Sequence, residues 1–260
     1  ETQVIKLKYR NFIKNVNLNL IGKIQLKNVL MAIIAASRSN VNMNKILETI
    51  PKINPVEGRL EKIGKIKNHA KVILDYAHTP AALKTCLLNL REQFPEKKII
   101  LLFGCGGDRD QNKRSKMGKI ASNYSDKIYL TDDNPRFENP VKIRQKIKKG
   151  IKIKKKVIEI SNRAIAISKA IKNLNTGEIL LVAGKGHEKT QDIGKRKIYF
   201  SDKDFIMRAI KVKNKNLSNN LKLNIVKELS RNEKLSNLLP IKQARINSKE
   251  IKENDIFFAI

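Results

Sequence analysis

Short apolar runs that alternate with longer, helix-like stretches constrain this chain more than any other feature. Five such runs rich in β-forming residues follow one another from Lys71 onward: Val72–Leu74, Ile99–Phe103, Ile128–Thr131, Val157–Ile160 and Ile179–Ala183. Continuous apolar runs of this length are typical of strands that are buried on both faces. The alternation therefore predicts an α/β fold, a Rossmann-like and mostly parallel, doubly wound sheet.

Capping residues mark where the intervening helices begin. Thr79 and Asn139 each precede a proline, and Ser161 precedes an amphipathic stretch, so each is placed as an N-cap. Helices are predicted from Pro80 to about Phe94, around 115–123, from Pro140 and over 162–174. Ile198–Phe200 is expected as a final strand, with a short helix behind Ser201 and Asp202.

Three of the predicted strands lead directly into charged loops. Gly104–Arg114 contains three glycines and several charges, Asp132–Arg136 follows the next strand, and Gly184–Glu188 follows the last apolar run. Because parallel strands present their carboxyl ends at one edge of a sheet, these loops are expected to meet there. Charges of both signs beside exposed backbone favour an anionic or zwitterionic small ligand.

The strongly basic composition raises a different function. The chain has 260 residues with a formal net charge of +31, which would suit a nucleic-acid-binding module. However, lysines are scattered over every predicted element, aromatic residues are 5% of the chain and tryptophan is absent. The simpler interpretation is an AT-rich coding sequence, with the run Lys146–Lys156 as a solvated helix end.

Several other site classes find no support in the sequence. A G-x-G-x-x-G dinucleotide fingerprint would need glycine at position 109, where Arg109 stands, and no G-x-x-x-x-G-K-[ST] loop is present. Cys86 and Cys105 have no metal or disulfide spacing; Cys86 is expected in the core, and Cys105 is either a small loop residue or a reactive thiol. We predict no metal site, signal peptide or membrane span, and hence a cytoplasmic protein.

Four motifs together resemble a known family. Asp75–Pro80, Gly104–Asp110 with Lys113 and Arg114, Asp133–Arg136 and Gly184–Glu188 look like the C-terminal half of the Mur ligases that add meso-diaminopimelate (MurE). The resemblance covers roughly residues 18–210 of this sequence. Asp75–Pro80 alone also occurs in folylpolyglutamate-type ligases, so a ligase of that type is the nearer alternative, and the nucleic-acid-binding module is the alternative from a different class.

The resemblance implies a set of residues around the amino acid: Arg109, Asp133, Asn134, Pro135, Arg136, Gly184 and Glu188. Arg109 and Arg136 are interpreted as clamps for carboxylates, because a guanidinium matches a carboxylate with two charge-assisted hydrogen bonds. Glu188 would hold an ammonium group, and Gly184 would allow close backbone approach. The alternative is that Arg109, Asp108 and Glu188 simply pair with one another across the loops.

The same resemblance implies ATP and Mg²⁺ as cofactors, with most Mg²⁺ ligands outside this sequence. Asn28 and Asp75 would lie near adenosine, Arg59 near the phosphates, and His78 and Lys113 at the catalytic cleft. Asn28 could instead be a helix N-cap and His78 an ordinary loop histidine. Where the family usually has Phe-Asn, this chain has Ile24 and Gln25. The implied reaction joins small-molecule substrates through an acyl phosphate in peptidoglycan synthesis.

The domain organisation is predicted from the same observations. Residues 1–57, with helices expected over 28–37 and 44–50, would be the end of a central ATP-binding domain, and 58–211 the amino-acid-binding domain. Residues 212–222 are expected as a linker, followed by a helix over 223–229. The segment 245–260 resembles the start of a MurF-like ligase, whose strand near Ile256–Phe258 is expected to lack its sheet partners. Both ends of the chain are interpreted as cuts, so the fragment alone is expected to be inactive.

Overall fold

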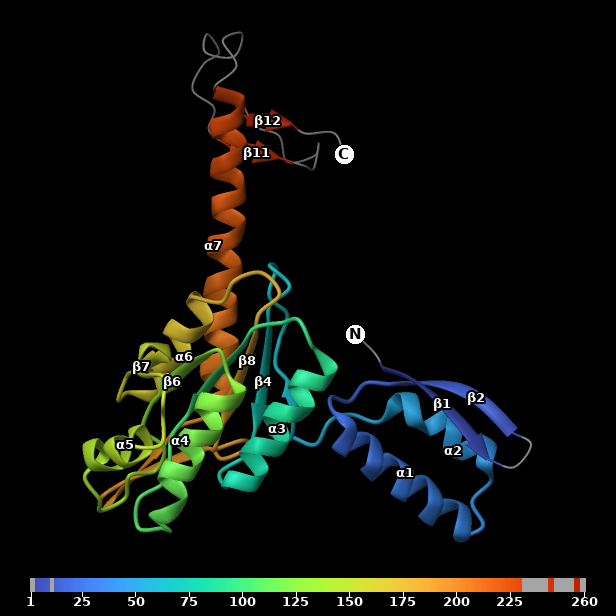
Figure 1. The fold of residues 1–260 in the computed structure, drawn as a ribbon. Helices are drawn as coiled ribbons and strands as arrows, with labels where there is room; N and C mark the ends of the chain where they lie inside the picture. Colours follow the sequence, from blue (N-terminus) through green and yellow to red (C-terminus); the bar gives the residue numbers. More distant parts are fainter. Residues whose placement is uncertain (1–2, 10–11, 231–242, 246–254, 258–260) are drawn as a thin grey trace. The chain divides into compact units, whose positions relative to one another are not determined.

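The computed structural model describes residues 3–9, 12–230, 243–245 and 255–257 (Figure 1). The chain divides into two compact units, Glu1–Ile210 and Lys211–Ile260. No helix in the described segments is long and apolar enough to cross a membrane.

The first unit is built on a six-stranded, mostly parallel sheet, as predicted. Its order is β3 (Glu61–Lys62), β4 (Lys71–Asp75), β8 (Ile179–Ala183), β5 (Ile99–Phe103), β6 (Lys127–Leu130) and β7 (Val157–Glu159). All neighbouring pairs are parallel except β3 with β4. The adjacent strands β5 and β8 have the predicted bounds and are buried at every residue, which explains their unbroken apolar sequences.

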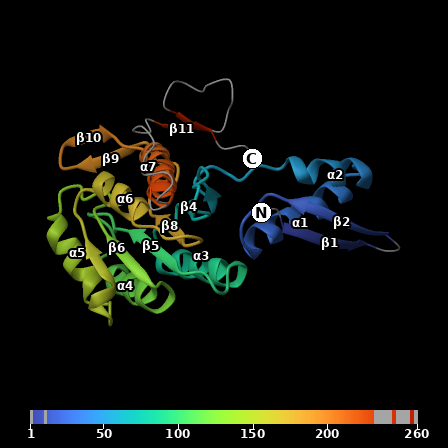
Figure 2. The ribbon, with the colours of Figure 1, turned by 90° about the horizontal axis from the view of Figure 1, so that it is seen from above.

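Helices cover both faces of this sheet (Figure 2). The helix α3 (Pro80–Gln93) packs beside α4 (Asn112–Tyr124), which packs beside α5 (Pro140–Lys148), on one face. After the edge strand β7 the chain returns to the middle of the sheet, where β8 lies between β4 and β5. The right-handed crossover from β7 to β8 places α6 (Arg163–Lys172) on the other face. This arrangement directs the loops after β4, β5, β6 and β8 to one edge.

Local capping explains two helix starts and corrects a third. The Thr79 side chain accepts from Ala82 N, and the Asn139 side chain accepts from Val141 N, as predicted. The cap of α6 is Asn162 rather than Ser161, because the Asn162 side chain accepts from Ile165 N. The backbone oxygen of Ser161 instead accepts from the Thr131 hydroxyl, so this residue belongs to the preceding loop.

The first part of the chain contains a hairpin that the sequence did not reveal. The strands β1 (Gln3–Tyr9) and β2 (Phe12–Leu18) pair antiparallel, and α1 (Lys23–Arg38), α2 (Met43–Thr49) and the 3₁₀ turn η1 (Ile50–Lys52) follow. The two expected helices correspond to α1 and α2. They share a small core with the hairpin, made by Val16, Leu18, Leu20, Val29, Leu47 and Ile50.

The end of the chain differs from the prediction in three respects. The expected final strand is β10 (Arg196–Tyr199), which pairs with β9 (Thr190–Ile193) outside the main sheet. The expected linker 212–222 is helical, within the continuous helix α7 (Asp202–Ser230), which contains no glycine or proline. In the second unit β12 (Asp255–Phe257) has a parallel partner, β11 (Gln243–Arg245). The remainder of the MurF-like segment, 246–254 and 258–260, lies outside the described residues.

Candidate active site

The loops after β4, β5, β6 and β8 surround a cavity of about 510 Å³, here called the amino-acid pocket. It brings together nearly all the residues predicted around the amino acid and at the catalytic cleft. These are His78, Arg109, Lys113, Asp133, Asn134, Arg136, Gly184 and Glu188. Pro135 does not line the cavity; its carbonyl instead accepts from Glu138 N. The three charged loops therefore meet at one site, as predicted.

The glycines of the first loop serve loop packing. A Cβ added to Gly104 would lie 2.3 Å from the Thr131 oxygen, and one added to Gly107 would lie 1.9 Å from the Pro135 oxygen. A Cβ at Gly106 would lie 2.9 Å from Arg136 Nη1. Side chains here would push the loops after β5 and β6 apart, so these glycines set the position of the second loop and of its arginine.

The two predicted clamp arginines both line the pocket, and each donates a hydrogen bond from Nη1 to a backbone oxygen. Among the described residues, Arg109 Nη1 donates to the Asp108 oxygen at 3.0 Å and Arg136 Nη1 donates to the Gly107 oxygen at 2.9 Å. Arg136 Nε lies 4.0 Å from Asp192 Oδ2. The alternative that Arg109 pairs with Glu188 is not what the structure has, because the partner of Glu188 is Lys185.

Acidic groups also line the pocket. Glu188 Oε2 accepts from Lys185 Nζ at 2.9 Å and from Asn134 Nδ2 at 3.1 Å. Burial alone would raise the pKa of Glu188, but the hydrogen bond and positive charge of Lys185 lower it overall, so Glu188 is a carboxylate. Gly184 has φ 118°, and a Cβ there would lie 2.6 Å from Asp133 Oδ2. The close approach that requires glycine is thus that of the Asp133 carboxylate.

A buried ion pair, between Arg163 and Asp202, lies next to these acidic groups. Arg163 and Asp202 are both fully buried, and the guanidinium contacts the carboxylate at 2.7 and 2.6 Å while also donating to the Ala183 oxygen. Asp133 and Glu188 are close enough to act electrostatically on Arg163. With Lys185, the cluster has two cations and three carboxylates, a formal net charge of −1 that suits a substrate ammonium group.

His78 and Lys113 are brought together as expected, with Tyr76 beside them. Lys113 Nζ donates to the His78 oxygen at 2.9 Å, and His78 Nδ1 lies 2.9 Å from the Tyr76 oxygen. Since a carbonyl oxygen only accepts, Nδ1 is the donor in this contact. Burial and the neighbouring Glu188 carboxylate raise the pKa of Tyr76, so its hydroxyl stays protonated.

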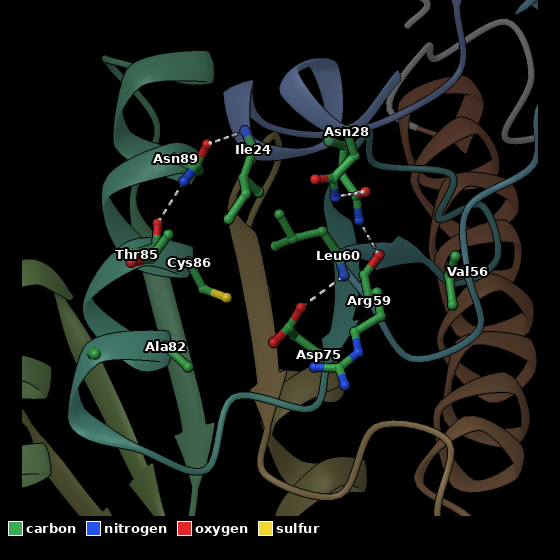
Figure 3. Close-up of a pocket in the computed structure, with 12 residues that line it drawn as sticks. Ile24, Asn28, Val56, Arg59, Leu60, Asp75, Ala82, Thr85, Cys86 and Asn89 are labelled. Carbon is green, nitrogen blue, oxygen red and sulfur yellow. Dashed lines mark hydrogen bonds between the residues drawn. The ribbon is translucent and has the colours of Figure 1, made fainter. Parts of the chain in front are cut away.

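A second cavity, of about 520 Å³ and here called the nucleotide pocket, contains the three predicted ATP-binding residues (Figure 3). Asn28 lies inside α1, whose N-cap is Gly22, so the alternative role of Asn28 as a helix cap is wrong. Asp75 is buried and accepts from Leu60 N at 2.8 Å and Ala77 N at 2.7 Å. The Arg59 guanidinium lies 4.9 Å from the centre of the Tyr76 ring, which also lines the amino-acid pocket.

The helix α3 joins the two pockets. Its N-cap Thr79 and first residue Pro80 line the amino-acid pocket, and residues from Ala81 to Asn89 line the nucleotide pocket. Asn89 Oδ1 accepts from Ile24 N at 3.3 Å and Gln93 Oε1 accepts from Gly22 N at 2.7 Å, which attaches the start of α1 to α3. Ile24, the departure from the family pattern, is itself a lining residue of the nucleotide pocket.

Both cysteines are buried, and neither is a reactive thiol. Burial is the main reason why the pKa of Cys86 is raised and the pKa of Cys105 rises to about 12. Cys105 Sγ contacts Met117 Sδ at 3.6 Å. The interpretation of Cys105 as a small residue between glycines is favoured. No group of three His, Cys, Asp or Glu side chains is arranged to hold a metal ion in the part of the chain that the structure describes.

Sequence reasoning missed four residues of these sites: Tyr76, Asn89, Lys116 and Lys185. Tyr76, Asn89 and Lys116 line the pockets, and Lys185 binds Glu188 from beneath. Tyr76 and Lys185 lie inside motifs that the resemblance had already marked, so their sequence position was a usable signal. Lys116 lies one helical turn from Lys113 on α4, whereas Asn89 carries no local signal.

Comparisons with known proteins agree with this geometry. Residues 58–186 match the family described as "Mur ligase, glutamate ligase domain". UDP-N-acetylmuramoyl-L-alanyl-D-glutamate–2,6-diaminopimelate ligase of Rickettsia felis is 40% identical over 217 residues, 81% of this chain and 40% of that protein. The ligase of the same name from Buchnera aphidicola is 43% identical over 198 residues, 76% of this chain and 39% of that protein. The chain thus spans about two fifths of the length of these relatives.

Solved structures give the same relationship. A structure of a UDP-N-acetylmuramoyl-L-alanyl-D-glutamate–2,6-diaminopimelate ligase superposes with a TM-score of 0.64 at 32% identity, over 81% of this chain and 43% of that one. Folylpolyglutamate synthase of Thermotoga maritima, at 20% identity and a TM-score of 0.54 over 69% of this chain and 40% of that one, shares the fold. The chain belongs to the Mur ligases through a C-terminal Mur ligase domain at residues 58–186.

Proposed function

We propose that this chain supplies the amino-acid-binding part of an ATP-dependent ligase that joins meso-diaminopimelate to UDP-N-acetylmuramoyl-L-alanyl-D-glutamate in peptidoglycan synthesis. The observation that carries the proposal is the amino-acid pocket, whose lining includes two arginines, Arg109 and Arg136, together with the carboxylates of Asp133 and Glu188. The relatives' names point to the same substrates. The proposal includes a domain boundary between residues 57 and 58 and a MurF-like origin of the segment 245–260.

The pocket suits an amino acid that carries charges at both of its ends. Diaminopimelate has an ammonium and a carboxylate at each end, whereas lysine lacks the second carboxylate. Arg136, positioned by Gly106 and Gly107, would bind that second carboxylate with two charge-assisted hydrogen bonds. Lysine would leave the guanidinium without this partner, which is the kind of loss that discriminates strongly between analogues.

ATP, when bound, supplies the phosphoryl group that activates the D-glutamate side-chain carboxylate, and the amine of diaminopimelate then displaces phosphate. This chain's own residues bind, orient and hold protons. Arg59, which lines the nucleotide pocket, would attract phosphate, and His78 and Lys113, joined by the hydrogen bond from Lys113 Nζ to the His78 oxygen, line the amino-acid pocket. The size and mixed lining of the nucleotide pocket fit a nucleoside. We place Mg²⁺ ligands outside the described residues.

Calorimetric titration of the 260-residue chain tests the proposal. The ligands are meso-diaminopimelate, L-lysine, L-glutamate and duplex DNA at about 0.15 M salt. We expect binding of meso-diaminopimelate only. Preference for glutamate would support the folylpolyglutamate-type alternative, and salt-dependent DNA binding without amino-acid binding would support the nucleic-acid-binding module.

Arg136→Ala tests the specificity in the same assay. Loss of two charge-assisted hydrogen bonds predicts a weakening of about 3–6 kcal/mol for meso-diaminopimelate. Arg196→Ala, which removes an exposed arginine from β10, is the matched control and should bind normally. Near-normal affinity of the Arg136 variant would refute the clamp.

A further inference from the structure

We propose that Lys185 is a positioning residue, which orients Glu188 and Asn134 to receive the ammonium group of the amino acid without contacting it. This inference rests on the proposed function and assigns a role to a side chain that does not line the pocket. Lys185 is fully buried, at 0% exposure, directly behind the wall formed by Glu188. A buried ammonium requires partners for its three N–H donors.

All three donors of Lys185 are used, and each goes to a different element of the site. The ammonium donates to Asn134 Oδ1 at 2.9 Å, Glu188 Oε2 at 2.9 Å and the Thr190 oxygen at 2.6 Å. These acceptors lie in the loop after β6, the loop after β8 and the first residue of β9. One side chain therefore links the loop after β6 to the turn between β8 and β9.

The contacts also determine which way the Asn134 amide faces. Asn134 Oδ1 accepts from Lys185 and from Asp192 N at 3.2 Å, and both of these groups only donate. The amide nitrogen must therefore face Glu188, to which it donates at 3.1 Å. Without Lys185 the amide would lose one of the two donors that orient Oδ1, and a rotated amide would turn its oxygen toward the Glu188 carboxylate.

Lys185 acts on the Glu188 carboxylate in two ways. Because Lys185 and Asn134 both donate to Oε2, the orientation of the carboxylate is restricted. The positive charge of Lys185 also keeps Glu188 ionised against the effect of burial. The other groups that act on this carboxylate are Asn134 and Tyr76, which hydrogen-bond it, and the charged side chain of Arg163.

Two variants separate the hydrogen bonds from the charge. Lys185→Met preserves length and removes both, while Lys185→Gln retains a donor and removes the charge. We expect Lys185→Met to weaken meso-diaminopimelate binding at pH 7 by about 30-fold or more, since it leaves buried acceptors without a cation. Lys189→Met, an exposed lysine of the same loop, is the matched control and should bind like wild type.

The pH dependence distinguishes positioning from a general structural role. In wild type the affinity should change little between about pH 6 and 8, since Glu188 stays ionised. Without the Lys185 charge the pKa of Glu188 rises, so in both Lys185 variants the affinity should begin to fall at a higher pH than in wild type as the pH is lowered. In a Glu188→Gln background, Lys185→Met should weaken meso-diaminopimelate binding much less than it does in wild type, because Lys185 acts on the ligand through Glu188.

The outcomes separate the two proposals. If wild type fails to bind meso-diaminopimelate, the proposed function fails, and this inference with it. If wild type binds and either folded Lys185 variant keeps the wild-type affinity and pH profile, the role of Lys185 is refuted while the function stands. Circular dichroism establishes folding, and Lys185→Gln decides the question if Lys185→Met does not fold. If the effects of Lys185→Met and Glu188→Gln on the binding free energy are fully additive, the inference is also refuted.

Discussion

Removal of the Asp202 carboxylate should cost this fold more stability than almost any other single polar change. Asp202→Asn would eliminate the counter-charge of Arg163, which is fully buried and makes two hydrogen bonds to the carboxylate at 2.7 and 2.6 Å. Arg163 Nη1 already has no hydrogen-bond partner among the described residues. The substitution thus leaves a buried cation without its counter-charge and replaces one of its two carboxylate acceptors by an NH₂ group, which cannot accept.

The magnitude follows from the burial of both partners. Breaking a buried ion pair by neutralising one member typically costs about 3–5 kcal/mol, because the other charge is left uncompensated. The nearby carboxylates Asp133 and Glu188 offset part of this cost. We therefore expect the free energy of unfolding to fall by about 3 kcal/mol, towards the lower end of that range.

Urea unfolding of the 260-residue chain, followed by circular dichroism, measures the effect. Asp204→Asn is the matched control: it lies in the same first turn of α7, and its carboxylate accepts from the exposed Tyr199 hydroxyl, so its loss should cost less than about 1 kcal/mol. Arg163→Met combined with Asp202→Asn should recover much of the lost stability, since no buried charge remains. Equal, small effects of the Asp202 and Asp204 substitutions would refute the argument.

Three further predictions concern the site loops. Gly184→Ala should abolish meso-diaminopimelate binding, measured by calorimetry, because its φ is 118° and a Cβ would lie 2.6 Å from a carboxylate oxygen; Gly194→Ala, with nothing within 4 Å of the added Cβ, should bind normally. Hydrogen bonding by Arg114 lowers the pKa of Glu138 to about 2. The ionised Glu138 therefore stabilises the fold above its unfolded-state pKa, and this stabilisation is lost as the pH falls towards 2. In urea unfolding, Glu138→Gln should be less stable than wild type at pH 7, and this difference in the free energy of unfolding should disappear as the pH is lowered. Cys105, with its pKa raised to about 12 by burial, should react with a thiol reagent only after denaturation, and rapid native labelling at neutral pH would contradict its burial.

Much of the candidate site could be predicted because its residues occur in contiguous motifs at strand ends. The bounds of β5 and β8 were predicted to the residue, since a strand buried on both faces has a local signature of unbroken apolar residues. Thr79 and Asn139 were predicted as caps because a capping side chain binds backbone groups two or three residues away. Ser161 misled, because its neighbour Asn162 is an equally good cap and the tertiary contact with Thr131 determines which is used.

The sequence by itself determined the parallel α/β class, the strand ends that form the site and the residue types in its loops, because these depend on hydrophobic period and on neighbours along the chain. The tertiary structure decided the strand order, the pairing of β9 with β10 and the contacts between loops. The burial of Lys185 against Asn134, 51 residues away, depends on how β6 and β8 are placed in the sheet. Long-range contacts of this kind have no periodic signal, so which charge faces the substrate and which supports it from behind emerges only when the sheet has formed.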